Sequence, residues 1–252
     1  MQYMEVIFFF IGAILGSFLN AWIWRTHVGA SMCRGRSACP QCKKALSWYE
    51  NLPILSFVLQ KGRCRECHAS ISLQYPLVEL SVGLLFAFTA WFHGNDSLLI
   101  LRDCFILFFL TFTFVYDVRY QEIWDRMTMY PATVLVVATV WFDWLSIPFM
   151  LIGVLVGMGF FFLQYLISRG RWIGGGDIRL GLFMGVILGW PLILLALFLA
   201  YIGGALFVLP FLLLGKKQMA TKVPFGAYLS IATVVTMFWG KGLVEWYIGL
   251  LM

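Results

Sequence analysis

Long apolar runs, separated by short polar connections, make up most of the chain. A helix needs about 20 consecutive, mostly apolar residues to cross the hydrocarbon core of a bilayer. The pattern therefore predicts an all-α polytopic membrane protein with about eight transmembrane helices. The break between the sixth and seventh runs rests only on Gly189-Trp190-Pro191. The predicted spans are residues 5–24, 76–93, 97–116, 127–143, 147–168, 178–190, 191–214 and 224–251.

Composition excludes several other classes of protein. Of the 252 residues, 62% are hydrophobic and 12% are charged, and the mean hydropathy is +0.87. These values do not fit a water-soluble globule or a disordered chain, and six cysteines are too sparse for a disulfide-stapled secreted fold. We expect the first apolar run to be retained as a helix, because Gln2 and Glu5 stand where a cleavable signal peptide has basic residues.

Basic residues are concentrated in alternate connections between the predicted spans. The net charge is +6, from 18 lysines and arginines against 12 acids, and all of the bases except Arg102 and Lys241 lie in four connections. Cytoplasmic loops of membrane proteins carry an excess of lysine and arginine. We therefore expect the amino terminus outside and these loops in the cytoplasm, facing anionic lipid headgroups of the bilayer rather than nucleic acid. The four connections are residues 25–75, 117–126, 169–179 and 215–223.

Two CxxC pairs stand in the loop 25–75, which is the one connection long enough to fold outside the bilayer. They are Cys39-Pro-Gln-Cys42 and Cys64-Arg-Glu-Cys67, with 21 residues between them. Four thiolates close a tetrahedron around zinc, which is the structural type of zinc site. Disulfides or free thiols are the less favoured alternative in a reducing compartment. A further cysteine of the loop, Cys33, is expected to be a bystander.

Three aspartates stand at the cytoplasmic ends of predicted spans. Asp117 ends the third span, Asp125 opens the fourth and Asp177 opens the sixth. The chain has no HExxH motif, so any hydrolysis must use other groups than those of a zinc protease. Two aspartates brought face to face can share one proton, so that one activates water while the protonated partner polarises the scissile carbonyl. The structural alternative is that Asp125 and Asp177 cap the amino-terminal ends of helices.

Three consecutive glycines, Gly174-Gly175-Gly176, directly precede Asp177. Glycine adopts backbone conformations closed to other residues and lets a second chain approach closely. We therefore expect the carboxylate of Asp177 to stand on a hinge of glycines, which have no side chains, beside a groove that binds a peptide. Neither GxGxxG nor GxxxxGK[ST] occurs, which makes nucleotide binding a weak alternative. Close helix contact is also expected in the fifth span, at Gly153, Gly157 and Gly159.

These motifs together resemble one family of bacterial membrane proteases, over a region from about Gly12 to Leu229. The amino-terminal part of the type IV prepilin peptidases is similar to five segments: Gly16-Ser17-Phe18-Leu19-Asn20, Cys39-Pro-Gln-Cys42, Trp48-Tyr-Glu-Asn51-Leu-Pro53, Gly62-Arg63-Cys64-Arg-Glu-Cys67 and Tyr75-Pro76-Leu-Val-Glu79-Leu80. The peptidase half of that family, with its GxGD signature, resembles the segment from Asp117 to Asp125, Gly174-Gly-Gly176-Asp177-Ile-Arg-Leu180 and Pro224-Phe225-Gly226.

The resemblance implies an aspartic endopeptidase whose catalytic residues are Asp117 and Asp177. Asp125, Gly174 and Gly176 become supporting residues. The implied substrates are prepilins and pseudopilins, from which a short basic leader is cut after a glycine at the cytoplasmic face of the bacterial inner membrane. The loop acids Glu50, Glu66, Glu79 and Glu122 are possible contacts for such a leader, although we expect each to be a solvated loop residue.

A second activity is implied for family members with the long cysteine loop. The new amino terminus is N-methylated, with S-adenosylmethionine as the methyl donor. On this basis residues 1–95 form a methyltransferase-associated part with two spans and the zinc loop, and residues 96–252 form a six-span GxGD peptidase domain. No donor-binding residue follows from the sequence.

The chain departs from the family pattern at four positions: Gln74 replaces a usual arginine, Trp124 a common proline, Arg179 a lysine and Ala227 a frequent proline. Two other classes of function compete with the peptidase. A transporter would use the aspartates as a proton relay, although relay acids usually lie near the midplane of the bilayer. An interaction scaffold would use the zinc loop for docking, with the aspartates as helix caps.

Overall fold

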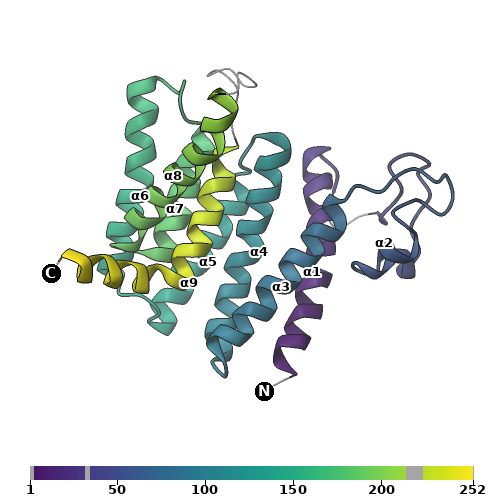
Figure 1. The fold of residues 1–252 in the computed structure, drawn as a ribbon, viewed down its shortest axis with the longest axis horizontal. Helices are drawn as coiled ribbons and strands as arrows, with labels where there is room; N and C mark the ends of the chain where they lie inside the picture. The colour runs from purple at the N-terminus through teal and green to yellow at the C-terminus, as the bar shows by residue number, and fades with distance from the viewer. Residues whose placement is uncertain (1–2, 32–34, 214–223, 252) are drawn as a thin grey trace. The chain divides into compact units, whose positions relative to one another are not determined.

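The protein is helical throughout its apolar segments. The computed structural model describes residues 3–31, 35–213 and 224–251 (Figure 1). Cys33, Arg34 and the bases of the connection 215–223 lie outside these residues, so the predictions made for them stay predictions. The helices are α1 (Met4–His27), the 3₁₀ helix η1 (Trp48–Asn51), α2 (Leu55–Leu59), α3 (Gln74–His93), α4 (Ser97–Tyr120), α5 (Arg126–Phe142), α6 (Ile147–Ser168), α7 (Gly175–Leu188), α8 (Leu192–Leu213) and α9 (Phe225–Leu251).

Each of the eight predicted spans corresponds to one helix, with ends that agree to within about one helical turn. Within the part of the chain that the structure describes, six helices are long and apolar enough to cross a membrane, namely α1, α3, α4, α6, α8 and α9. The remaining two are shorter: α5 has 17 residues and α7 has 14. At 1.5 Å per residue, α7 is only about 21 Å long, against about 30 Å of hydrocarbon. The all-helical membrane fold is confirmed, and eight crossings remain a prediction.

The chain divides into two compact units, Met1–Phe108 and Phe109–Met252, and α4 runs from one into the other. In the first unit, α1 packs along α3 through glycines that leave no room for a side chain. A Cβ at Gly12 would lie 2.6 Å from the carbonyl oxygen of Val82, and one at Gly16 would lie 2.8 Å from Cα of Glu79. Inside a bilayer the lipid tails are as apolar as the helix surfaces, so hydrophobicity does not drive two helices together. Close backbone packing of this kind does.

Helix α7 is the centre of the second unit, where it contacts α5, α6, α8 and α9 (Figure 1). Leu180, Phe183 and Met184 of α7 are fully buried, which explains why so short an apolar helix is stable there. Its contact with α6 is made backbone to backbone, because a Cβ at Gly157 would lie 2.3 Å from the carbonyl oxygen of Gly181. Close contact is thus confirmed for Gly153 and Gly157, but a Cβ at Gly159 would meet nothing, so that prediction is wrong.

Two of the four acids expected to be solvated are buried, so the prediction is wrong for Glu50 and Glu79. Glu79 lies on α3, and its Oε2 accepts a 2.7 Å hydrogen bond from the backbone N–H of Ile54. Ile54 has φ +62°, a conformation that a β-branched residue rarely adopts. Glu79 therefore fastens the start of α2 to a membrane helix. Glu66 and Glu122 are exposed, as predicted.

Candidate functional site

Asp117 lies in the last turn of α4 and is buried, with 4% of its surface exposed. The backbone N–H of Ala227 donates a 2.9 Å hydrogen bond to Oδ2 of Asp117. A Cβ added at Gly226 would lie 3.1 Å from the same oxygen, so glycine lets the chain come close to the carboxylate here. Ala227 belongs to the first turn of α9, where backbone N–H groups are free to bind an anion. The carboxylate is therefore fixed by the amino-terminal end of α9.

Asp177 is the third residue of α7 and is half-buried. Its Oδ2 accepts a 3.0 Å hydrogen bond from the backbone N–H of Gly174, the residue that precedes the helix. The expected cap is thus present at Asp177, and it anchors one carboxylate oxygen to the glycine turn.

The glycine turn before Asp177 is built differently from the prediction. None of Gly174, Gly175 and Gly176 has a positive φ, so the expectation of a conformation closed to other residues is wrong. Close approach is confirmed at one of the three. A Cβ at Gly176 would lie 2.7 Å from Cβ of Ile123, whereas one at Gly175 would meet nothing. Gly176 is therefore the glycine that packing requires.

Ile123 links the two aspartates. It lies in the connection between α4 and α5, against Gly176 beside Asp177, and its Cδ1 would lie 2.8 Å from a Cβ at Gly226, beside Asp117. The α4–α5 connection, the glycine turn and the start of α9 thus meet in one place. The structure brings together two acids that lie 60 positions apart in the sequence.

Asp125 has another position and another partner. It directly precedes α5 but makes no side-chain cap, so the cap alternative is wrong for this residue. Instead, Oδ1 of Asp125 accepts a hydrogen bond from Nη1 of Arg179, two residues beyond Asp177 on α7. About half of each side chain is exposed. This ion pair joins the start of α5 to the helix that carries Asp177.

The four predicted thiol ligands form a cluster in the first unit. The Sγ atoms of Cys39, Cys42, Cys64 and Cys67 all lie within 4.8 Å of one another, and no disulfide joins them. Those of Cys39 and Cys67 are 3.8 Å apart. In a tetrahedral site with Zn–S bonds of about 2.3 Å, neighbouring sulfurs are separated by about 3.8 Å, so the cluster has the dimensions of a zinc site.

The cluster is built from two copies of one turn. In the first, the N–H of Cys39 donates to the carbonyl oxygen of Lys44 and the N–H of Lys43 donates to that of Cys39. Cys64, Ala69 and His68 repeat these bonds in the second. The residue after each CxxC, Lys43 or His68, has a positive φ. Backbone N–H groups of Cys67 and Glu66 also lower the pKa of the Cys64 thiol to about 7, which favours the thiolate that a metal binds.

Both halves of the chain match profiles of known families. Residues 10–93 match the bacterial peptidase A24 N-terminal domain, and residues 104–209 match the type IV leader peptidase family. A prepilin leader peptidase/N-methyltransferase of Bacillus subtilis is 31% identical over 242 residues, which cover 96% of this chain and 97% of the relative. The chain belongs to the type IV leader peptidase family. The resemblance found in the motifs is thereby confirmed.

Other relatives bear the same name as the Bacillus protein. The one from Legionella pneumophila is 29% identical over 85% of this chain and 76% of its own length. The one from Pseudomonas putida is 29% identical over 91% and 88%, respectively. No solved structure matches the chain significantly. Similarity to type IV leader peptidases thus extends over both units.

Several residues around the aspartates in this leader peptidase were not predicted. Tyr201 of α8 donates a 3.0 Å hydrogen bond to Oε1 of Gln164 on α6, and its ring centroid lies 4.9 Å from that of Phe225, two residues before Ala227. Polar side chains within apolar spans are the one sequence signal that points to Tyr201 and Gln164. Ile123 and Ala227 carry no such signal, because one acts by packing and the other through its backbone.

Proposed function

We propose that this chain is an aspartic endopeptidase whose catalytic pair is Asp117 and Asp177. The observation that carries the proposal is the meeting of these acids around Ile123, with Asp117 buried and both carboxylates anchored by backbone N–H groups. Asp125 acts in support, by holding α5 to α7 through Arg179. Membership of a peptidase family favours this function over a proton relay or a scaffold.

The chemistry follows from two carboxylates that share one proton. The ionised member accepts a proton from water as the water oxygen attacks the scissile carbonyl, and the protonated member donates its proton to the carbonyl oxygen. The tetrahedral intermediate collapses when the C–N bond breaks: the leaving amine takes the proton that the first carboxylate accepted from water, and the hydroxyl formed from the carbonyl oxygen returns its proton to the second carboxylate. Because Oδ2 of each aspartate is held by a backbone N–H, little reorganisation is needed at the moment of reaction.

We infer that the substrates are type IV prepilins and pseudopilins; the relatives are named prepilin leader peptidases, which supports prepilins. Such a precursor has a basic leader followed by an apolar helix, and it is cut after a glycine. The location of the bases supports a cytoplasmic active site in the cytoplasmic membrane of a bacterium, with the amino terminus outside. An enzyme with its acids at that boundary meets the scissile bond without extracting the helix from the bilayer.

We propose zinc as a structural ion of the cytoplasmic loop, held by Cys39, Cys42, Cys64 and Cys67. Four thiolates leave no open position for water, so the ion would stabilise the loop and would not act in hydrolysis. Lys44 also holds the two CxxC turns together. Its Nζ lies 3.4 Å from a carboxylate oxygen of Glu66, which belongs to the second turn.

We propose N-methylation of the new amino terminus, with S-adenosylmethionine as donor; the names of the relatives, which are N-methyltransferases, support the methylation. We associate it with residues 1–95, the part that contains the cysteine loop.

Single substitutions test the catalytic pair. Asp117→Asn and Asp177→Asn, assayed on a prepilin in lipid vesicles, are each expected to abolish release of the leader. Asp143→Asn is the matched control, because Asp143 is exposed in the connection between α5 and α6 and has a left-handed conformation that asparagine tolerates. Normal cleavage by either of the first two variants would remove that aspartate from the mechanism.

A further inference from the structure

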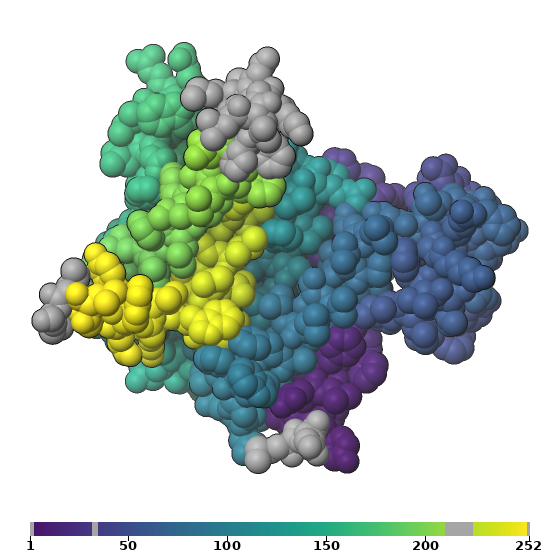
Figure 2. All heavy atoms as spheres, in the orientation of Figure 1, coloured from purple at the N-terminus to yellow at the C-terminus, as the bar shows by residue number. Residues whose placement is uncertain are grey.

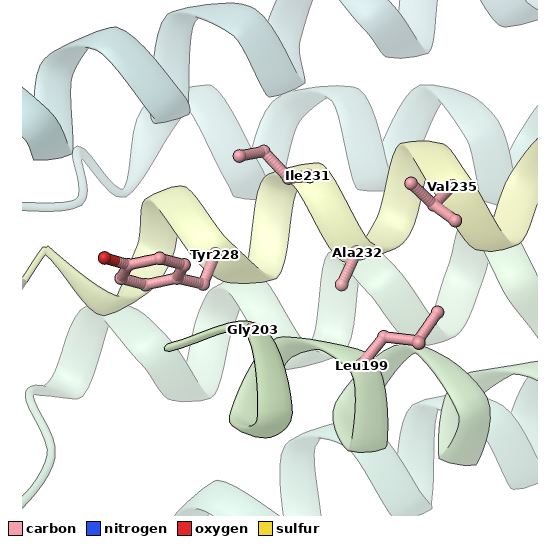
Figure 3. Close-up of a pocket in the computed structure, with 6 residues that line it drawn as sticks. All are labelled: Leu199, Gly203, Tyr228, Ile231, Ala232 and Val235. Atoms are coloured by element: carbon pink, nitrogen blue, oxygen red, sulfur yellow. The ribbon is translucent and has the colours of Figure 1, made fainter. Parts of the chain in front are cut away.

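Apolar side chains are exposed in both units. In the second unit, α8 and α9 border an apolar cavity of about 210 Å³ (Figure 3), as expected of membrane helices whose surfaces meet lipid. In the first unit, apolar side chains are also exposed on α2, which has five residues and is too short to span a bilayer. Figure 2 shows the loop that contains α2 as a lobe at the side of its unit. The apolar surface of α2 therefore requires its own explanation.

One face of α2 consists of exposed apolar side chains. Leu55, Val58 and Leu59 have the spacing i, i+3 and i+4 of one helix face, and they are 51%, 62% and 62% exposed. On the opposite face, the ring of Phe57 packs at Gly62, where a Cβ would lie 3.1 Å from it. Phe57 thus holds α2 to the rest of the loop, and the leucine and valine side chains point away from it.

The start of α2 is bonded to the side of α3, well inside that helix. The backbone N–H of Ile54, directly before α2, donates to Glu79, the sixth residue of α3. At 1.5 Å per residue, Glu79 is about 8 Å from the first residue of α3. A Cβ at Gly16 of α1 would lie 2.8 Å from Cα of Glu79, and Arg25 is nine residues, or about 14 Å, nearer the loop end of α1. The start of α2 therefore lies at a level where α1 and α3 are both membrane helices.

This level determines what surrounds α2. Headgroups add only about 5–8 Å to each side of the hydrocarbon, so a position about 14 Å below Arg25 is inside the acyl-chain region when Arg25 lies among the headgroups. In Figure 1, α2 lies at the height of α1 and α3 rather than beyond their ends. An exposed leucine or valine at this height meets lipid instead of water.

The backbone at the start of α2 is suited to lipid. The first N–H groups of a helix lack acceptors within it, and in hydrocarbon such groups must be bonded inside the protein. The N–H of Ile54 donates to Glu79, and those of Leu55 and Ser56 donate to the carbonyl oxygens of the two residues before Ile54. Lys61 and Arg63, which follow α2, are exposed and carry the charge that anionic headgroups attract.

We propose that α2 is an interfacial helix that inserts Leu55, Val58 and Leu59 among the acyl chains of the cytoplasmic leaflet, with Lys61 and Arg63 at anionic headgroups. Apolar faces next to bases are typical of helices that lie in a membrane surface. The partner is the lipid bilayer itself, so the inference does not depend on the peptidase function. It gives the cysteine loop a third attachment to the membrane, in addition to α1 and α3, and keeps the four-cysteine cluster close to the bilayer surface.

Photo-crosslinking in vesicles that contain phosphatidylglycerol identifies what covers α2. p-Benzoylphenylalanine replaces Val58 or, as the control, Ala30, an exposed residue beyond α1 whose N–H donates to the carbonyl oxygen of Arg25. We expect a phospholipid adduct from position 58 and none from position 30. Capture of residues of the second unit or of another copy of the chain by position 58, without a lipid adduct, would overturn the proposal, and so would equal lipid capture from both positions.

A charge on the same face tests attachment of the loop. Val58→Asp places a carboxylate among acyl chains, whereas Ala30→Asp places it outside them and is the matched control. In vesicles with the loop outward, we expect trypsin to cut within residues 25–75 about tenfold faster in Val58→Asp than in Ala30→Asp, because cleavage follows the population of the detached loop. The cutting rate in the second unit is expected to stay unchanged, which separates detachment from unfolding of the whole protein. Equal cutting of the loop in the two variants would overturn the proposal.

Discussion

Oδ2 of Asp117 accepts a 2.9 Å hydrogen bond from the backbone N–H of Ala227, across 110 positions of sequence. The donor is a backbone N–H group, which every residue except proline would supply at position 227. The bond joins the last turn of α4 to the first turn of α9.

Replacing Ala227 by proline tests this hydrogen bond. Proline is tolerated in the first turn of a helix, so Ala227→Pro removes the donor without breaking α9. A hydrogen bond to a charged group contributes about 1.5–3 kcal/mol, and we expect kcat to fall about tenfold. Ala227→Val keeps the N–H while enlarging the side chain and should retain most of the activity. A proline variant as active as the parent would show that the bond is dispensable.

Gly176 is predicted to be indispensable while its neighbour Gly175 is not. Alanine at position 176 would bring its Cβ to 2.7 Å from that of Ile123, so the turn that carries Asp177 must shift. Misplacement of a reacting group by about 1 Å costs about 100-fold in rate. Gly175→Ala, whose Cβ meets nothing, should cleave normally. Kinetics on a prepilin in vesicles compare the two, and equal rates would mean that Ile123 does not position Asp177.

The ion pair of Asp125 and Arg179 is predicted to be helpful but not essential. Side chains that are about half exposed gain only about 0–1 kcal/mol from such a contact. Asp125→Asn should therefore lower the cleavage rate about fivefold at most, and Arg179→Gln should have a similar effect that does not add to the first. Complete loss of activity in Asp125→Asn would instead place this residue in the catalytic pair.

Loss of one thiol is predicted to release the proposed zinc ion and to loosen the loop 25–75. Cys39→Ser removes a buried ligand from the four-cysteine cluster, so bound zinc should fall and limited proteolysis should cut within residues 25–75. Cys104→Ser is the control, because Cys104 is buried in α4 and does not belong to the cluster. Metal analysis of the purified proteins compares them; unchanged zinc content in Cys39→Ser would refute the four-thiolate site.

Apolar runs and motif spacing predicted much of this protein. A span is recognisable because every position along about 20 residues must suit hydrocarbon, and four cysteines in two CxxC turns form a cluster through local geometry. The same reasoning made the third span too short. It placed Asp117 at the end of the span, whereas α4 continues to Tyr120 and Asp117 is buried in its last turn.

The contacts that arrange the site could not be predicted in this way. The hydrogen bond of Ala227 comes from its backbone, which is the same in every residue except proline. Ile123 acts by packing against Gly176 and Gly226. Nothing in the sequence indicates that this isoleucine and these glycines are in contact. Glu79 was expected to be a solvated loop acid, and its burial depends on how α3 packs against α1.

Cross-linking between positions 117 and 177 tests most directly whether the two acids act as a pair. Asp117→Cys combined with Asp177→Cys is treated in membranes with a short bifunctional thiol reagent, and the linked peptides are identified by mass spectrometry. Asp117→Cys combined with Asp143→Cys is the control. The account predicts a 117–177 link and no 117–143 link. Full single modification of both cysteines, without any link between positions 117 and 177, would contradict it.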